Sequence, residues 1–282
     1  MPLLIGEINK LKVKRETDIS YILIEDNEPY EVFMHFNQAT RRLTENEIVE
    51  VFLYYDNRHR LCATMEDPII TTKKFGFVEC VAQKENVGCF MNIGIAKDIL
   101  LSKDILPANT KAWPKLGDKL PCILKVKKDS LVCKILSRDD LTTKSSSLKV
   151  NDTTSAYVTS FTSTGLLAVD EEYNIIYVHK SMIRKKYRIG EEIILTIINI
   201  NSKGEYNGST ITQKETMRLS DSEMLLNYLK EMGGVIPLGN ASTPEEISKI
   251  FTLSKSAFKR AVGALYKERL IDIEDHRIIL KK

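Results

Sequence analysis

Two clusters of basic side chains are the residues of this chain best suited to binding a ligand, and their chemistry is the neutralisation of phosphate groups. The first cluster places five cations within nine residues, with Tyr187 among them. Its members are Lys180, Arg184, Lys185, Lys186 and Arg188. Lysine and arginine displace counterions from phosphates, so a dense basic loop suits a nucleic-acid backbone. An isolated basic run is more often a solvated loop that keeps the surface soluble, so the surrounding elements decide between the two.

The second cluster lies on a predicted helix near the C-terminus, residues 255–267. At 100° per residue, one face of this helix is apolar and carries Phe258, Ala261, Val262, Leu265 and Tyr266. The opposite face carries Lys255, Ser256, Lys259, Arg260 and Lys267. Gly263 falls in the basic arc, where its missing side chain would let a sugar-phosphate backbone approach. The alternatives are an ordinary solvated lysine face and a glycine that packs against another domain.

Catalytic and metal-binding groups do not stand at productive spacings. Asp139, Asp140 and the acidic run at 170–172 fit surface turns, because no histidine lies at ligand spacing. The four histidines are scattered along the chain. Gly234 and Gly239 have phosphate-loop spacing but lack the Lys-Ser/Thr that must follow. We therefore expect a protein that is not an enzyme and that holds neither a cofactor nor a metal.

Composition narrows the class of protein and its compartment. The 282 residues carry a net charge of only +3, so any nucleic-acid site must come from local clustering of cations. The five cysteines are odd in number and form no Cys-x-x-Cys pair, which favours reduced thiols and a cytoplasmic location. No apolar run approaches the length that spans a bilayer. We expect neither export nor membrane insertion.

Most of the first 214 residues are predicted to form short strands, which position these side chains. Alternating runs at 21–24, 48–53 and 193–198 are typical. Three units open at Gly6, Gly76 and Ala156 with a period of about 70 to 80 residues, the size of a five-stranded OB-type barrel. A second marker, Gly followed by Asp or Glu, stands at 117 and 190, whereas the first unit has Asn46 and lacks the glycine. The pattern predicts three successive barrels.

The last 68 or so residues are expected to be helical, with strong start signals. A capping box at Ser220 and Glu223 opens a first helix, which Gly233 and Gly234 end. Thr243, followed by Pro244, caps a second, and Ser254 caps the third. Residues 271–273 and 277–280 form a two-stranded wing. Helices followed by a wing are the order of a winged-helix domain.

The expected fold is therefore a mainly β, multidomain chain, with three tandem five-stranded OB-type barrels and a small α/β winged helix. The first barrel spans 1–66 and the second 67–138. A polar linker at 139–152 leads to the third barrel at 153–214, and the winged helix takes 215–282.

Several motifs resemble known RNA-binding domains. The third unit, through Ala156, Gly165 and residues 177–181, is similar to the domain first described in ribosomal protein S1, and its Val-His-x-Ser piece is the most specific part. The second unit resembles the same domain through Gly76, Gly88 and Gly117, with Leu101 in place of the histidine. The whole chain resembles the conserved virulence factor B family of bacterial RNA-binding regulators, most clearly at residues 113–118 and 254–268. This resemblance implies RNA binding and an effect on gene expression.

The chain departs from the S1 pattern where that domain stacks bases. Aromatic residues flank the second-strand glycine in typical copies. Here those positions hold Val87 and Phe90 in the second barrel, and Thr164 and Leu167 in the third. Base stacking contributes about 1 to 3 kcal/mol per base, so we expect weak binding dominated by phosphates. The first barrel has aromatic residues at 33 and 36 but no clear glycine, and we expect it to be mainly a scaffold.

The expected partner is single-stranded RNA. We assign base stacking to Phe90 and His179, and phosphate contacts to Lys180, Arg184, Lys185, Lys186, Arg188, Lys255, Lys259 and Arg260. One alternative is a DNA-binding transcription regulator that reads a duplex with its winged helix. Another is a ribonuclease that uses the acidic turns.

Overall fold

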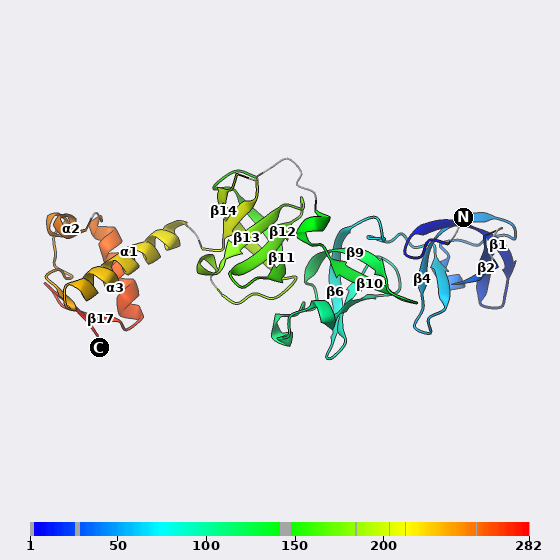
Figure 1. The fold of residues 1–282 in the computed structure, drawn as a ribbon, viewed down its shortest axis with the longest axis horizontal. Helices are drawn as coiled ribbons and strands as arrows, with labels where there is room; N and C mark the ends of the chain where they lie inside the picture. The colour runs from blue at the N-terminus through cyan, green and yellow to red at the C-terminus, as the bar shows by residue number, and fades with distance from the viewer. Residues whose placement is uncertain are drawn as a thin grey trace. The chain divides into compact units, whose positions relative to one another are not determined.

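The structure is a computed structural model that describes residues 3–25, 29–141, 148–183, 185–202, 204–211, 213–251 and 253–281, with only the backbone described at 213–220. The chain divides into two compact units, Met1–Thr210 and Ile211–Lys282. Within the described residues, the first unit holds three closed barrels and the second holds three α-helices with a three-stranded sheet (Figure 1). The predicted fold class, three five-stranded barrels before a winged helix, is confirmed.

Each barrel is built from five strands. The first barrel comprises β1 (Ile8–Glu16), β2 (Ser20–Ile24), β3 (Glu31–His35), β4 (Ile48–Tyr55) and β5 (Leu61–Thr64). The second comprises β6 (Gly76–Lys84), β7 (Gly88–Asn92), β8 (Ile99–Ser102), β9 (Lys119–Val126) and β10 (Leu131–Ile135). The third comprises β11 (Thr153–Phe161), β12 (Gly165–Asp170), β13 (Ile175–His179), β14 (Glu192–Ile200) and β15 (Tyr206–Ser209). The first strand of the third barrel therefore begins three residues before Ala156, the residue expected to open this unit.

The three barrels share one topology. The first strand pairs antiparallel with the second and the fourth, and the third strand runs parallel to the fifth. A bulge interrupts the first strand at the same place in each repeat, between Val13 and Arg15, between Cys80 and Ala82, and between Val158 and Ser160. Bulges bend a strand and increase its twist, which a small closed barrel requires.

The second repeat marker adopts one backbone conformation in all three barrels. Gly117 has φ 86°, Gly190 has φ 79°, and Asn46 has φ 66°. Asparagine is one of the few residues that tolerate this left-handed region, because its side chain can bond locally. Asn46 is thus the equivalent of the glycine that the first barrel lacks.

The core follows the alternation of the strands. In β7, Cys89 and Met91 are buried and Phe90 between them is partly exposed. The first barrel has its own hydrophobic cluster, which includes Leu11, Leu23 and Leu53. The second and third barrels share a continuous cluster that includes the buried Trp113, whose Nε1 donates to the Pro107 carbonyl at 2.6 Å. A second apolar contact joins these two barrels, where the Phe77 and Tyr173 rings stack with centroids 5.3 Å apart.

Short 3-10 turns follow the third strand of each barrel. They are η1 (Phe36–Gln38), η2 (Lys103–Ile105) and η5 (Lys180–Met182). Two more, η3 (Thr110–Ala112) and η4 (Arg138–Asp140), precede and follow the last strand pair of the second barrel. The turn η4 lies in the segment predicted as a linker, and residues 142–147 of that segment lie outside the described residues.

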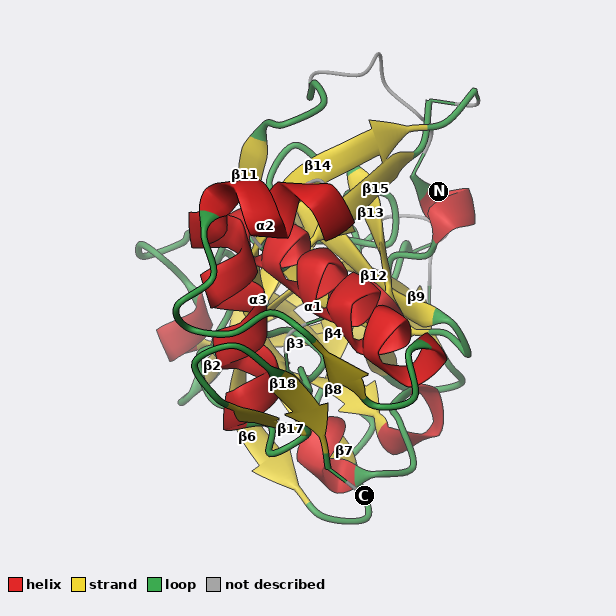
Figure 2. Ribbon diagram, turned by 90° about the vertical axis from the view of Figure 1, so that its left-hand side faces the viewer, coloured by secondary structure: helices red, strands yellow, loops and turns green. Residues whose placement is uncertain are grey.

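The C-terminal unit contains α1 (Gln213–Glu231), β16 (Val235–Ile236), α2 (Pro244–Ile250), α3 (Lys255–Lys267), β17 (Ile271–Ile273) and β18 (Ile278–Leu280). In this unit α1 packs along α3 (Figure 2). Thr243 caps α2 with a complete capping box, and Ser254 caps α3, as predicted. The paired strands β17 and β18 form the predicted wing, and β16 adds a third strand to their sheet. The two-residue β16 was missed because it directly follows the glycine pair at 233 and 234.

The predicted start of the first helix is wrong. Ser220 is not a cap, because α1 already begins at Gln213 and crosses the boundary expected at residue 214. Residues 213–218 are mostly strong helix formers, which extend the helix toward its N-terminus. Ser222 is buried inside this helix, where its hydroxyl donates to the Ala261 carbonyl of α3 at 3.3 Å. Ser222 thus contributes to the packing of α1 against α3.

None of the described helices is long and apolar enough to span a membrane.

Candidate nucleic-acid interface

In every barrel, the last residue of the third strand caps the 3-10 turn that follows it. His35, Ser102 and His179 each precede the 3-10 turn and accept a hydrogen bond from the backbone N–H two residues later. Their partners on the second strand are equivalent as well, namely Ser20, Gly88 and Gly165. The residue that replaces the histidine in the second barrel is therefore Ser102, and the assignment to the buried Leu101 was wrong by one position.

In the second and third barrels, glycine is required at the second-strand position because the next strand passes very close. A Cβ on Gly165 would lie 2.0 Å from the Val178 carbonyl oxygen, and one on Gly88 would lie 2.1 Å from that of Leu101. In the first barrel this position holds Ser20, which is buried and pairs with His35. The first barrel thus keeps the register of the other two, although a search for glycine overlooks it.

One aromatic side chain belongs to the equivalent cross-strand pair on the outer face of each barrel, on the third strand in the first and third barrels and on the second strand in the second barrel. The three are Phe33, Phe90 and Tyr177, and each belongs to a cross-strand pair between the second and third strands. All three are partly exposed. Phe90 was identified from the sequence, whereas Phe33 and Tyr177 were not assigned to stacking. The alternation of buried and exposed positions along β3 and β13 could have identified them from the sequence.

The first barrel has the most developed surroundings for its aromatic residue. The guanidinium of Arg60 lies 5.6 Å from the centre of the Phe33 ring, and the His35 ring centre lies 6.4 Å away. Asp56 holds Arg60 in place, with Nε donating to Oδ2 at 2.8 Å. A cation over an aromatic face and an adjacent imidazole form a surface on which a base can stack. These contacts make Phe33 and Arg60 a candidate binding surface, and the expectation that the first barrel is mainly a scaffold stays a prediction.

His179 is exposed, but one ring nitrogen already has a structural use. Its Nδ1 lies 2.8 Å from the Ser181 hydroxyl and accepts from the Ser181 N–H at 3.3 Å. These contacts fix the His179 ring at the end of β13. The hydroxyl of Thr164, on the neighbouring strand side, lies 2.8 Å from that of Tyr177. The ring is held in place beside the aromatic position, so it remains a candidate for base contact.

The basic run at 180–188 separates into exposed and engaged cations. Lys180 and Lys186 are exposed, and in the described part of the chain neither forms an ion pair. Lys185 is bonded to Glu191, with Nζ 2.8 Å from Oε1, and this hydrogen bond raises the pKa of Lys185. Arg184 lies outside the described residues. Lys180 and Lys186 are accordingly the stronger phosphate candidates.

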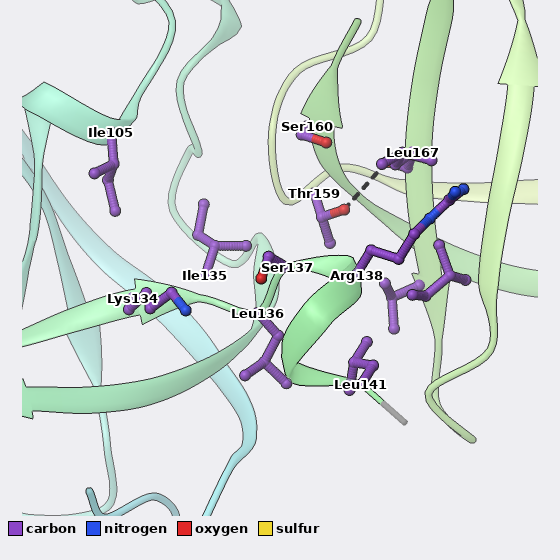
Figure 3. Close-up of a pocket in the computed structure, with 12 residues that line it drawn as sticks. Ile105, Lys134, Ile135, Leu136, Ser137, Arg138, Leu141, Thr159, Ser160 and Leu167 are labelled. Carbon is purple, nitrogen blue, oxygen red and sulfur yellow. Dashed lines mark hydrogen bonds between the residues drawn. The ribbon is translucent and has the colours of Figure 1, made fainter. Parts of the chain in front are cut away.

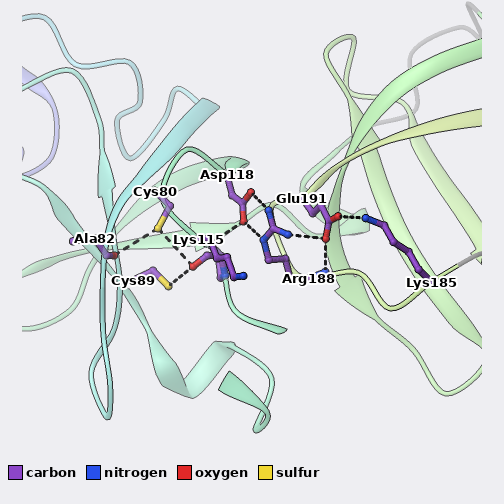
Figure 4. Close-up of polar contacts among 9 residues, drawn as sticks. Cys80, Ala82, Cys89, Lys115, Asp118, Lys185, Arg188 and Glu191 are labelled. Carbon is purple, nitrogen blue, oxygen red and sulfur yellow. Dashed lines mark hydrogen bonds and ion pairs between the residues drawn. The ribbon is translucent and has the colours of Figure 1, made fainter. Parts of the chain in front are cut away.

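Arg188 has a structural partner that the sequence did not suggest. Its Nε and Nη2 each donate at 2.7 Å to the carboxylate of Asp118 in the second barrel, and Nη1 lies 3.0 Å from Glu191 (Figure 4). The hydrogen bond with Asp118 raises the pKa of Arg188. A bidentate arginine–carboxylate pair uses the donors that a phosphate would need. We therefore remove Arg188 from the candidate phosphate contacts and assign it to the junction of the two barrels.

The basic face of α3 lies largely as expected. Lys259, Arg260 and Lys267 are exposed, and Lys255 is partly exposed. A Cβ added to Gly263 would meet no atom within 4 Å, so this glycine does not pack against a neighbour among the described residues. Tyr266 was expected on the buried face but is 54% exposed. Its position, 80° around the helix from Phe258 at 100° per residue, puts it at the border of the apolar stripe.

The acidic turns have structural roles. Asp140 ends η4, where its carboxylate accepts from the backbone N–H of the N-cap Ser137 at 2.8 Å and pairs with Lys134 at 2.7 Å. Partial burial opposes its ionisation, but hydrogen bonds from Lys134 and Ser137 outweigh that effect and lower the pKa of Asp140 to about 2. Asp170 is buried and accepts bonds from the backbone N–H groups of Glu172 and Asn174. Across the described ranges, no three His, Cys, Asp or Glu residues are grouped so that they could hold a metal ion.

Comparisons with known proteins agree with this architecture. Residues 5–66 match the S1 domain, residues 75–133 match the CvfB first S1-like domain, and residues 223–280 match the CvfB-like winged helix domain. The chain is 31% identical to the uncharacterized protein YitL of Bacillus subtilis over 93% of this chain and 89% of that protein. It is 31% identical to conserved virulence factor B of Staphylococcus epidermidis, covering 87% of this chain and 88% of that one.

A further relative and one solved structure are also similar. Conserved virulence factor B of Staphylococcus aureus is 30% identical, over 85% of this chain and 81% of that protein. A multidomain protein with nucleic acid binding domains from Streptococcus pneumoniae has a similar fold, with a TM-score of 0.61 and 24% identity over 98% of both chains.

Proposed function

Because this chain belongs to the conserved virulence factor B family, we propose that it binds single-stranded RNA and acts as a post-transcriptional regulator of bacterial gene expression. The observation that carries the proposal is the repeated aromatic position. Phe33, Phe90 and Tyr177 occupy the same outer-face pair in three successive OB-type barrels. OB-type barrels bind oligonucleotides on this part of their surface, and stacking on an exposed ring requires unpaired bases.

The charges support phosphate contact next to these rings. Lys180 directly follows His179 and is exposed, and Lys186 is exposed within the same loop. Asp118 and Glu191 engage Arg188 and thereby neutralise the most buried cation among the described residues of the run. We propose that the aromatic rings stack on bases and that Lys180 and Lys186 contact phosphates.

The test is the affinity of the full chain for a fluorescein-labelled 24-nucleotide uridine RNA, measured by anisotropy at fixed salt. Phe33→Ala, Phe90→Ala and Tyr177→Ala should each weaken binding by roughly 5- to 150-fold, since a stacked base contributes about 1 to 3 kcal/mol. Tyr30→Ala is the matched control, because Tyr30 is 62% exposed but lies outside the repeated pair. Equal affinity of all four variants and the parent chain would show that the repeated rings do not bind RNA.

A DNA-binding regulator is the second candidate, and the basic face of α3 favours it. Ser254 caps this 13-residue helix, which presents Lys259 and Arg260 on its exposed side. Winged-helix and related domains place such a helix in the major groove of a duplex. Competition at one salt concentration separates the two functions. If duplex DNA displaces the uridine RNA at lower concentration than unlabelled RNA does, the regulator of transcription is the better description.

A further inference from the structure

A pocket of about 290 Å³ lies between the second and third barrels, inside the N-terminal unit (Figure 3). One wall comes from the end of β10 and the start of η4, with Ile135 and Leu136. The opposite wall comes from the outer face of the third barrel, with Leu167, Val169 and Ile175. The walls are mainly apolar, and neither barrel forms the pocket alone.

The pocket continues the aromatic face of the third barrel. Leu167 lines the pocket and is also the cross-strand partner of Tyr177. The next pair on the same face, Val169 with Ile175, also lines the pocket. Two residues along a strand span about 7 Å. A ligand that stacks on Tyr177 can therefore extend into the pocket without leaving this face of the barrel.

Polar groups are few and lie among these apolar walls. Thr159 donates its hydroxyl to the Leu167 carbonyl at 3.3 Å, and Arg138 is held by Glu205 with Nη1 2.7 Å from Oε1. The Ser160 side chain, by contrast, makes no hydrogen bond to any residue that the structure describes. Apolar walls with a small number of polar groups suit a flat ring whose faces are apolar and whose edge bonds to hydroxyls.

The state of the nucleic acid decides whether a base can reach the pocket. Bases inside a duplex are stacked and paired, so they cannot enter a lateral pocket unless they are flipped out. An unpaired base on a flexible strand meets no such obstacle.

We propose that this pocket receives one unpaired nucleobase of an RNA strand whose neighbouring base stacks on Tyr177. The proposal rests on the proposed RNA-binding function and adds a site that depends on the junction of two barrels. Ser160 is the residue placed to bond to the edge of the base. The Arg188–Asp118 ion pair and the Phe77–Tyr173 stack hold the two walls together.

The first test fills the pocket from its rim. Ser160→Trp introduces a large ring at a partly exposed position of β11, and Thr153→Trp adds the same ring at an exposed position of the same strand, seven residues away. With a labelled 12-nucleotide uridine RNA, Ser160→Trp should weaken binding by on the order of tenfold. Thr153→Trp should stay within about twofold of the parent. Equal affinity of the Ser160→Trp variant and the parent would overturn the pocket.

The second test needs no substitution and remains valid if Ser160→Trp fails to fold. Methyl resonances of Leu167, Val169 and Ile175 are followed by NMR in the full chain during titration with the 12-nucleotide uridine RNA. A ribose-phosphate strand of the same length without bases is the matched probe. The methyl groups should shift with uridine RNA only. Equal shifts with both strands, or shifts with neither while RNA still binds, would contradict the proposal.

The two proposals can fail separately. If the parent chain binds neither strand, the RNA-binding function itself is wrong and the pocket falls with it. If the parent binds uridine RNA but the pocket methyl groups do not respond, only the pocket is wrong.

Discussion

Arg188 and Asp118, 70 residues apart in the chain, form a bidentate ion pair with both N–O distances at 2.7 Å. The same guanidinium reaches Glu191 at 3.0 Å. Asp118 and Glu191 are equivalent positions of successive repeats, because each follows the left-handed glycine and its carbonyl accepts from the bulge of the first strand. One arginine thus joins the matching acidic residues of two barrels.

Replacing this arginine should lower the stability of the folded chain. Arg188→Met keeps the aliphatic length and removes every donor, which leaves the carboxylate of Asp118, 8% exposed, without its cation. We expect the free energy of unfolding in urea to fall by about 1 to 3 kcal/mol. The control is Arg277→Met, whose pair with Glu274 is exposed to solvent and should contribute much less to stability. A variant as stable as the parent would show that the junction does not depend on this pair.

Asp140 should make stability depend on pH in the acidic range. Its pKa is lowered from 3.8 to about 2, so the folded chain binds this proton less readily than the unfolded chain. The contribution of Asp140 is therefore complete above pH 4 and is lost as pH falls toward 2. Asp140→Asn should be less stable than the parent at pH 7, and the difference should shrink between pH 4 and pH 2. A difference that is constant over this range would contradict the assignment.

The second-strand glycines should not accept a side chain. Gly165→Ala would bring Cβ to 2.0 Å from the Val178 carbonyl oxygen, a backbone atom that no rotamer change can move. We expect a loss of about 2 kcal/mol or more in unfolding free energy. Gly263→Ala is the matched control, since open space surrounds that position, and it should stabilise α3 by about 0.5 to 1 kcal/mol. Equal effects of the two substitutions would refute the close approach.

The salt dependence of RNA binding should reveal whether α3 touches phosphates. Each phosphate contact with a single strand contributes about 0.7 to the slope of log affinity against log salt. Lys259→Glu with Arg260→Glu should reduce this slope by about 1.4. Arg277→Glu with Lys281→Glu makes the same charge change at wing cations that Glu274 and Asp272 already pair. An identical slope in both double variants would exclude α3 from the interface.

The sequence by itself determined the features that depend on local geometry. The three repeats were recognisable because a left-handed turn demands glycine or asparagine, as at Gly117, Gly190 and Asn46. The faces of α3 followed from helical periodicity, and the caps at Thr243 and Ser254 from hydrogen bonds within one turn. Each of these signals is complete within a few residues, so the chain carries it without reference to the rest of the fold.

Only the tertiary structure decided which of the candidate side chains are engaged by other residues of the chain. Lys185 and Arg188 look like their neighbours in the basic run, but they are engaged by Glu191 and Asp118. Phe33 and Tyr177 join Phe90 only when the strands are set in register. Ion pairs and cross-strand pairs depend on where distant segments meet, and Asp118 reaches Arg188 only because two barrels pack together. That junction also creates the pocket beside Tyr177, which no local pattern in the sequence contains.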